Sequence, residues 1–120
     1  MADFIKTTGS VARGRKLSLY IPSKDKDGHS VDHAHWKRNT MAFLMRLFGR
    51  CTAMPNLEGI WAEDGKTIEE TTIIVFSYVL EDDLNRHAEE IRNYLIEMGT
   101  STHQAEVGFG YDGAFYTLTL

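Results

Sequence analysis

Cysteine is almost absent from this chain, which has one, Cys51, among 120 residues. A single cysteine cannot form a disulfide within the chain, which favours a reducing compartment. No apolar run approaches the length of a membrane-spanning helix, and the first residues, MADFIKTTGSVARGRK, lack the continuous apolar core of a signal peptide. We therefore expect a cytoplasmic protein without a membrane partner.

The chain also has fewer basic than acidic residues. The chain has 13 Lys and Arg against 17 Asp and Glu, a net charge of -4, whereas a dedicated nucleic-acid binder normally shows a basic face. The stretch Arg13–Lys16 is basic and could contact phosphate. The stretch Gly108–Tyr111 is faintly similar to the RNA-recognition motif but lacks its basic start and its continuation. These features argue against a nucleic-acid partner.

The common motifs of catalysis do not occur either. The sequence has no P-loop, no dinucleotide-binding fingerprint, no serine-nucleophile elbow and no H-E-x-x-H zinc motif. Cys51 has no catalytic partner near it in sequence, and a small buried apolar role is more common for such a residue. The absence of an assembled catalytic constellation favours a protein that is not an enzyme.

The composition that remains is typical of one soluble globular domain. The hydrophobic share is 42% and the charged share 25%, and 120 residues suffice for a core without disulfides or metal. Residues 1–15 show no hydrophobic period, and we expect them to form a flexible N-terminal arm. Residues 16–120 then form a single domain.

A long β-hairpin over Leu57–Val79 is the strongest local prediction. Asp64-Gly65 is a two-residue type I′ turn signal, because both residues tolerate positive φ. A tight turn there places Trp61 opposite Ile68 and Gly59 opposite Glu70. The second arm of the hairpin also carries the most apolar run in the chain, at residues 73–76.

The remaining elements complete a ferredoxin-like α+β pattern. We expect a strand over Lys16–Ile21, a helix from about Asp32 to Phe48, a second helix from Glu81 to Gly99 and a strand from Gln104. A turn at Asp112-Gly113 leads into an extra short strand near the C-terminus. The order βαββαβ predicts an antiparallel sheet with both helices on one face.

The other face of that sheet has no helix to cover it. Ile73 and Val75 alternate with Ile74 and Phe76, and a strand that is apolar on both faces is usually buried on both. We expect Ile73, Val75 and Tyr20 to need another cover. Either the chain supplies it, through its N-terminal arm or its final hairpin, or a second copy does so in a homodimer.

Candidate binding residues lie on the strands of this face. Two carboxylates that point from a sheet into a cleft can act as a general acid and base. Glu70 stands opposite a glycine and Glu106 beside Gly108, which leaves room for a ligand or a partner; the alternative is that both carboxylates simply face solvent. The candidate binding residues are Tyr20, Trp61, Glu70, Gln104 and Glu106.

A candidate divalent-metal site lies in the first loop and the start of the first helix. Its expected ligands are His29, His33 and His35 with nearby aspartates, because imidazole and carboxylate groups bind zinc and similar ions. His33 and His35 diverge by about 200° on a helix and converge only if their segment is extended. The alternative is a group of solvated loop residues and a helix N-cap at Asp32, with no cofactor at all.

The chain also resembles a family of small bacterial proteins of uncharacterised function. The resemblance covers roughly Leu17 to Phe109 and includes LSLYIPSKDKDG, GIWAEDGKTIEE and QAEVGF. The hairpin pattern that carries it is Gly59, Trp61, Asp64, Gly65 and Glu70. It implies no catalytic residues.

Together these patterns predict a small binding or accessory module of bacterial or mobile-element origin. The module would act through its sheet face and would associate with itself or with another protein. A metal-dependent hydrolase that uses His29, His33, His35 and nearby aspartates is the alternative.

Overall fold

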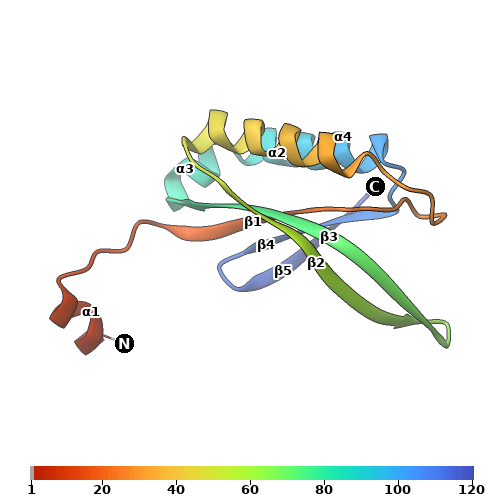
Figure 1. Cartoon of the computed structure of the whole chain (residues 1–120). Helices are drawn as coiled ribbons and strands as arrows, with labels where there is room; N and C mark the ends of the chain where they lie inside the picture. Colours follow the sequence, from red (N-terminus) through yellow and green to blue (C-terminus); the bar gives the residue numbers. More distant parts are fainter. Residues whose placement is uncertain (1) are drawn as a thin grey trace.

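The computed structural model describes residues 2–120, apart from the side chains of Ala2, Asn56, Trp61 and Glu63. The elements follow one another in the order shown in Figure 1. They are α1 (Ala2–Thr8), β1 (Arg15–Ile21), α2 (His33–Phe48), β2 (Thr52–Glu63), β3 (Lys66–Val79), α3 (Glu81–Arg86), α4 (Ala88–Ser101), β4 (Glu106–Tyr111) and β5 (Ala114–Thr119).

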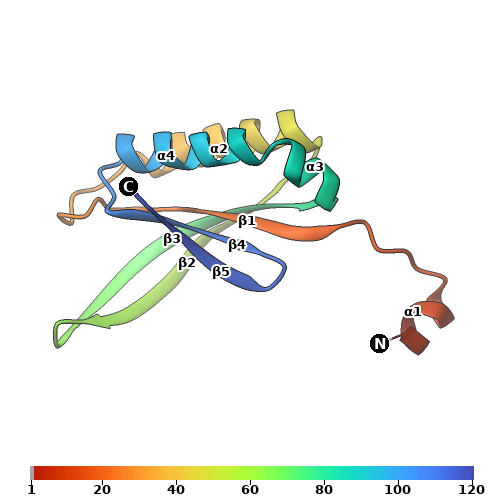
Figure 2. The ribbon, with the colours of Figure 1, turned by 180° about the vertical axis from the view of Figure 1, so that it is seen from behind.

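The five strands form one antiparallel sheet with the order β2-β3-β1-β4-β5. This is the ferredoxin-like arrangement with one additional strand at the β4 edge, which confirms the predicted fold class. The helices α2 and α4 lie side by side over one face of the sheet, and the long β2–β3 hairpin extends beyond them (Figures 1 and 2). Within residues 2–120, no helix lies against the opposite face.

The hairpin has the predicted turn and register. Asp64 and Gly65 both adopt positive φ, 50° and 74°, as a type I′ turn requires. Trp61 pairs with Ile68, and Gly59 pairs with Glu70. The β-turn therefore determines which hairpin side chains share a face.

Helix α2 begins and ends at the predicted residues. The Asp32 carboxylate accepts a hydrogen bond from the backbone N–H of His35, and Gly49 ends the helix in the left-handed region at φ 77°. Thr40, Phe43 and Leu44 are buried against the sheet. A fully buried leucine such as Leu44 stabilises the fold by roughly 1.5–3 kcal/mol relative to an exposed one.

The second predicted helix differs from the prediction in two ways. It divides at His87 into α3 and α4, because His87 has φ -105° and ψ 10° and its N–H bonds to the Asp83 and Leu84 carbonyls. Gly99 does not end α4, which continues to Ser101. A Cβ at Gly99 would collide with Leu120 and Val107, so the glycine allows the helix to approach β4 closely.

The helices cover the face of the central strand that we expected them to leave open. Val75, 0% exposed, and Ile73 lie beneath the helices together with Leu17, Leu19 and Ile21 of β1. Tyr20 and Ile74 are paired on the other face, where both are half-buried. The face that lacks a helix is therefore the face of Tyr20, Ile74 and Phe76.

The N-terminal segment contains a short helix, α1, where we expected no regular structure. It lies away from the sheet and helices (Figures 1 and 2), and Phe4 and Val11 are exposed. The division into an arm and a domain at residue 15 stays a prediction. Among the described residues, no helix combines the length and apolarity needed to cross a membrane.

A buried tyrosine links the two long helices and predicts a pH dependence. Tyr94 donates a hydrogen bond to Asn39 Oδ1 at 2.9 Å, and its hydroxyl lies 2.7 Å from Thr40 Oγ1. Burial raises the pKa of Tyr94 to about 12, although the Thr40 hydrogen bond opposes the shift. An unfolded tyrosine has a pKa of about 10, so the contribution of the neutral phenol to stability is complete below about pH 10 and is lost as pH rises toward 12.

We therefore expect the wild-type free energy of unfolding to fall between about pH 10 and 12 more steeply than that of Tyr94→Phe. Urea titrations over this range, with phenolate absorbance as a second readout, measure the difference. Equal slopes for the two proteins would contradict the assignment.

Candidate functional site

The open face of the sheet holds a cavity of about 300 Å³. This volume is at the lower end of the range for small-molecule sites. Strands from both halves of the fold contribute to it, so it exists only once the sheet is complete. It is lined by Tyr20, Pro22, Gly59, Glu70, Thr72, Gln104, Glu106, Val107, Gly108 and Phe115.

Four of the five predicted binding residues line this cavity: Tyr20, Glu70, Gln104 and Glu106. The fifth, Trp61, has a side chain outside the described part of the chain; its backbone lies in β2, opposite Ile68. The structure thus brings together residues that are up to 86 positions apart in sequence, as the numbers 20 and 106 show. That they bind a ligand remains a prediction.

A stacked aromatic pair forms one end of the cavity. The rings of Tyr20 and Phe115 lie 5.2 Å apart at an interplanar angle of 23°. A Cβ at Gly108 would come within 2.6 Å of Phe115 Cζ, so the glycine gives the ring room to lie across β4. Phe115 remains 59% exposed, although a stacked partner and a strand lie beneath it.

Phe115 was not among the binding residues predicted from the sequence. The Asp112-Gly113 turn and the strand beyond it were predicted, but the register of that strand with β4 was not. The structure pairs Phe115 with Gly110, which places the ring on the open face. Alternation after the turn predicts that Phe115 and Tyr116 lie on opposite faces of the sheet. Which face each residue occupies depends on how the strand pairs in the tertiary structure.

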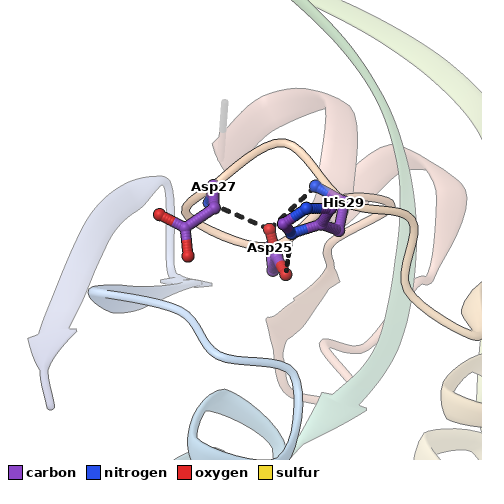
Figure 3. A group of neighbouring side chains, drawn as sticks. All are labelled: Asp25, Asp27 and His29. Carbon is purple, nitrogen blue, oxygen red and sulfur yellow. Dashed lines mark hydrogen bonds and ion pairs between the residues drawn. The ribbon is translucent and has the colours of Figure 1, made fainter.

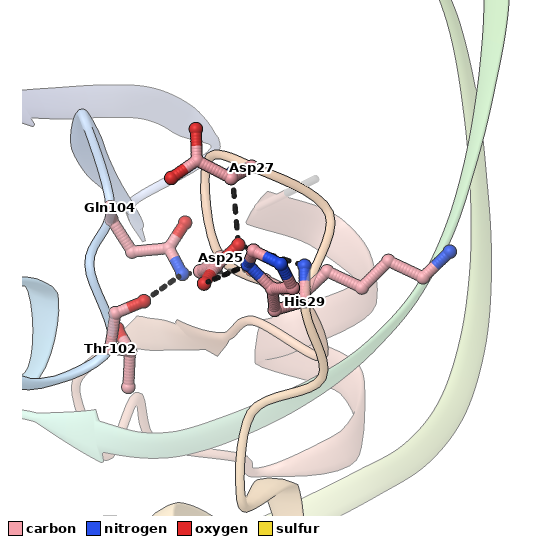
Figure 4. A network of polar contacts seen from close by, with 6 residues as sticks. Asp25, Asp27, His29, Thr102 and Gln104 are labelled. Carbon is pink, nitrogen blue, oxygen red and sulfur yellow. Dashed lines mark hydrogen bonds and ion pairs between the residues drawn. The ribbon is translucent and has the colours of Figure 1, made fainter.

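Gln104 connects the cavity to the loop after β1. Its Nε2 donates to the backbone carbonyls of Lys24 at 2.8 Å and Thr102 at 3.1 Å (Figure 4). Both amide hydrogens are therefore used, and the group that Gln104 can offer a ligand is the acceptor Oε1. Lys24 in turn forms an antiparallel bridge with Ser30, which closes the loop.

Glu70 borders more than one hollow. Two further grooves, of about 710 and 500 Å³, adjoin the hairpin and also include Glu70. Gly59 lies opposite Glu70 and lines two of the three hollows. Glu70 is half-buried, whereas Glu106 is exposed. A carboxylate in this position can receive a cation or a proton from a bound ligand.

The predicted histidine ligands do not come together. His29 lies with Asp25 and Asp27, and ligand atoms of these three residues are within 4.8 Å of one another (Figure 3). His33 Nε2 instead contacts the Ile21 carbonyl oxygen at 3.0 Å, and the His35 ring packs edge-on against Trp36. The prediction of a site formed by His29, His33 and His35 was wrong, because α2 begins at His33 and its helical spacing separates the two rings.

The Asp25 carboxylate has a structural role in the loop. Its Oδ1 accepts hydrogen bonds from the backbone N–H groups of Asp27 and His29, and its Oδ2 lies 3.2 Å from His29 Nδ1. The backbone bond from His29 is the largest cause that lowers the pKa of Asp25. These bonds stabilise the turn of the 23–31 loop, whose residues line the two grooves that adjoin the cavity.

Two other candidate features are accounted for by local contacts. Arg15 of the basic stretch pairs with Asp112. Cys51 lies 3.5 Å from the Met41 carbonyl oxygen, and burial raises the pKa of its thiol, which lowers the fraction of reactive thiolate. Neither feature points to a ligand.

Comparison with known proteins finds the fold in an enzyme. No family model matches the chain, and no curated protein does. A solved structure of a phage SAM lyase in complex with S-methyl-5′-thioadenosine is similar to it, with a TM-score of 0.65, 14% identity and 92% of each chain covered. The apo state of a phage SAM lyase is similar with a TM-score of 0.58 and 13% identity, over 92% of this chain and 97% of the other.

These structures overturn the function expected from sequence. We expected a non-enzymatic binding module, with a metal-dependent hydrolase as the alternative. Both similar structures are lyases, a class that neither expectation includes.

Gly59 allows a test of whether the fold needs a glycine at this position beside the cavity. Its φ is not positive, and an added Cβ would meet only the Glu70 carbonyl oxygen, at an ordinary 3.7 Å. Since glycine weakens a strand by roughly 0.5–1 kcal/mol, we expect Gly59→Val to keep or raise the free energy of unfolding. Urea unfolding of the two proteins measures the change, and a clear loss of stability would show that the backbone needs glycine there.

Proposed function

We propose that the chain is an S-adenosylmethionine lyase, which cleaves this sulfonium compound and leaves S-methyl-5′-thioadenosine. The main support is the cavity on the open face, which combines an aromatic pair with two carboxylates. The similarity of the fold to two solved structures of a phage SAM lyase over 92% of this chain adds to it.

The chemistry of the cavity suits such a substrate. S-adenosylmethionine carries a flat purine at one end and, toward the other, positive charges on the sulfonium and the amino group and a negative charge on the carboxylate, so that this half is a net cation. Carboxylates attract a cation most strongly where the medium is less polar than water, as at the half-buried Glu70. The net charge of -4 also favours the approach of a cation.

The proposed reaction breaks a carbon–sulfur bond without water. The electron pair of the bond remains on sulfur, which becomes the neutral thioether of S-methyl-5′-thioadenosine. In an elimination, the carbon attached to sulfur loses its bond to sulfur, the next carbon along the chain loses a proton to a base, and a double bond forms between these two carbons. We assign the base to Glu70, because it is half-buried and borders each of the three hollows beside the hairpin.

Replacement of Glu70 tests this assignment directly. We expect Glu70→Gln to lower the rate of S-methyl-5′-thioadenosine formation by about 10²–10⁴-fold, because the amide cannot accept the proton. Binding of S-methyl-5′-thioadenosine, measured by calorimetry, should change little. Chromatography of reactions with S-adenosylmethionine measures the rate.

Glu89→Gln is the matched control, since Glu89 is exposed on α4, the helix on the opposite face of the sheet. It should retain the wild-type rate. A wild-type protein that neither cleaves S-adenosylmethionine nor binds S-methyl-5′-thioadenosine would overturn the proposed function. Gly59→Val supplies a second check, because it should fold normally and lose turnover as its side chain fills the cavity.

We further propose that the enzyme acts in the cytoplasm as a homo-oligomer. The single cysteine is compatible with a reducing compartment. The 12-residue strand β2 lies at the edge of the sheet, and Ile60 on it is 68% exposed. A long edge strand has unpaired backbone N–H and C=O groups that can pair with another chain.

Self-association through β2 predicts a solution mass that is a multiple of one chain. Ile60→Asp should shift the protein toward the monomer, since a charge on an edge strand opposes pairing. Val11→Asp is the control, because Val11 is similarly exposed, 65%, but lies in the N-terminal segment. Sedimentation velocity distinguishes the species. A wild-type protein that stays monomeric at high concentration would contradict this proposal, and a shift caused only by Val11→Asp would move the interface to the N-terminal segment.

A further inference from the structure

The carboxylates of the cavity are displaced from its aromatic pair along the strands, Glu106 by two residues from Gly108, against which Phe115 packs, and Glu70 by a longer distance. Tyr20 pairs with Ile74, whereas Glu70 lies four residues before Ile74 on the same strand. Four residues of strand span about 13 Å. The cavity is therefore chemically divided along the direction of β3.

The aromatic end presents a flat apolar surface. Phe115 and Tyr20 stack with an interplanar angle of 23°, and Gly108 lacks a side chain that would lift the Phe115 ring from the strand. An exposed ring placed beside a cavity offers its face to a planar ligand. Stacking of a nucleobase on such a ring contributes about 1–3 kcal/mol and does not depend on hydrogen bonds.

Beyond the aromatic pair, the polar side chains that line the cavity offer acceptors, and Lys24 and Lys26 lie farther out, in the adjoining groove. Glu70 and Glu106 contribute carboxylates, and Gln104 contributes Oε1 because both of its amide hydrogens bond to backbone carbonyls. A group with acceptors and negative charge favours a cation that donates hydrogen bonds, such as an ammonium. It disfavours a neutral group that only accepts them.

We propose that the Tyr20–Phe115 pair holds the adenine ring, and that the Glu70–Gln104–Glu106 end holds the cationic methionine half of the substrate. This inference rests on the proposed function and adds the orientation of the substrate in the cavity. It also names the residues that distinguish substrate from product, because S-methyl-5′-thioadenosine carries the adenine but no positive charge.

Two neighbouring aromatic residues of β5 test the adenine subsite. Phe115→Leu should weaken binding of S-methyl-5′-thioadenosine by about ten- to a hundredfold through the loss of stacking. Tyr116→Leu should leave binding unchanged, because Tyr116 is also exposed, 46%, but stacks on Phe109 toward the helix-covered face. Calorimetry with wild type and both variants measures the affinities, and circular dichroism verifies that each variant is folded.

Glu106→Gln tests the cation subsite with two probes. The first is sinefungin, an adenosyl compound in which a protonated amine replaces the sulfonium and which the enzyme cannot cleave at sulfur. The second is S-methyl-5′-thioadenosine. We expect Glu106→Gln to weaken sinefungin at least tenfold and S-methyl-5′-thioadenosine little, whereas Phe115→Leu should weaken both by a similar factor.

The outcomes separate this inference from the proposed function. If the wild type binds neither probe, both fail. If the wild type binds S-methyl-5′-thioadenosine but Phe115→Leu and Tyr116→Leu behave alike, the proposed function survives and the adenine subsite is wrong. If Glu106→Gln weakens both probes equally, the cation subsite is wrong.

Discussion

The antiparallel pairing of β1 with β3 is the constraint on which both faces of this protein depend. Once Leu19 lies opposite Val75, alternation assigns every neighbour on the two strands to one face or the other. The face of Leu19 and Val75 is buried beneath α2 and α4. The face of Tyr20 and Ile74 lies open, because two helices on one side of a sheet cannot cover the other.

The open face differs from an ordinary solvated sheet surface. It carries an exposed phenylalanine stacked on a tyrosine, two carboxylates and two glycines, Gly59 on β2 and Gly108 on β4. Of these glycines, Gly108 is required by the ring above it, whereas neither backbone conformation nor close contact requires Gly59. Proteins accept such local losses of strand stability where a ligand needs the space.

Anchoring of the 23–31 loop connects this surface to the rest of the fold. Asp25 organises the loop through backbone hydrogen bonds, and Gln104 attaches it to the segment between α4 and β4. The loop is therefore hydrogen-bonded to the segment that leads into β4, the strand of Glu106. A polar cluster that resembles a metal site in sequence is explained here by the turn that it stabilises.

The local sequence alone determined much of the secondary structure of this protein. Short-range patterns predicted the turns, the helix ends and the ferredoxin-like order, because positive φ, capping and amphipathic periods depend on neighbours in sequence. The residues concerned are Asp64-Gly65 and Asp112-Gly113 in the turns, Asp32 at the start of α2 and Gly49 at its end. The register Gly59–Glu70 followed from the turn in the same way. Tertiary structure decided which face the helices cover, the continuation of α4 past Gly99, and the meeting of Phe115 with Tyr20. Each of these depends on contacts between segments far apart in the chain, and a pattern of period two or 3.6 specifies alternation without saying which side will meet the partner.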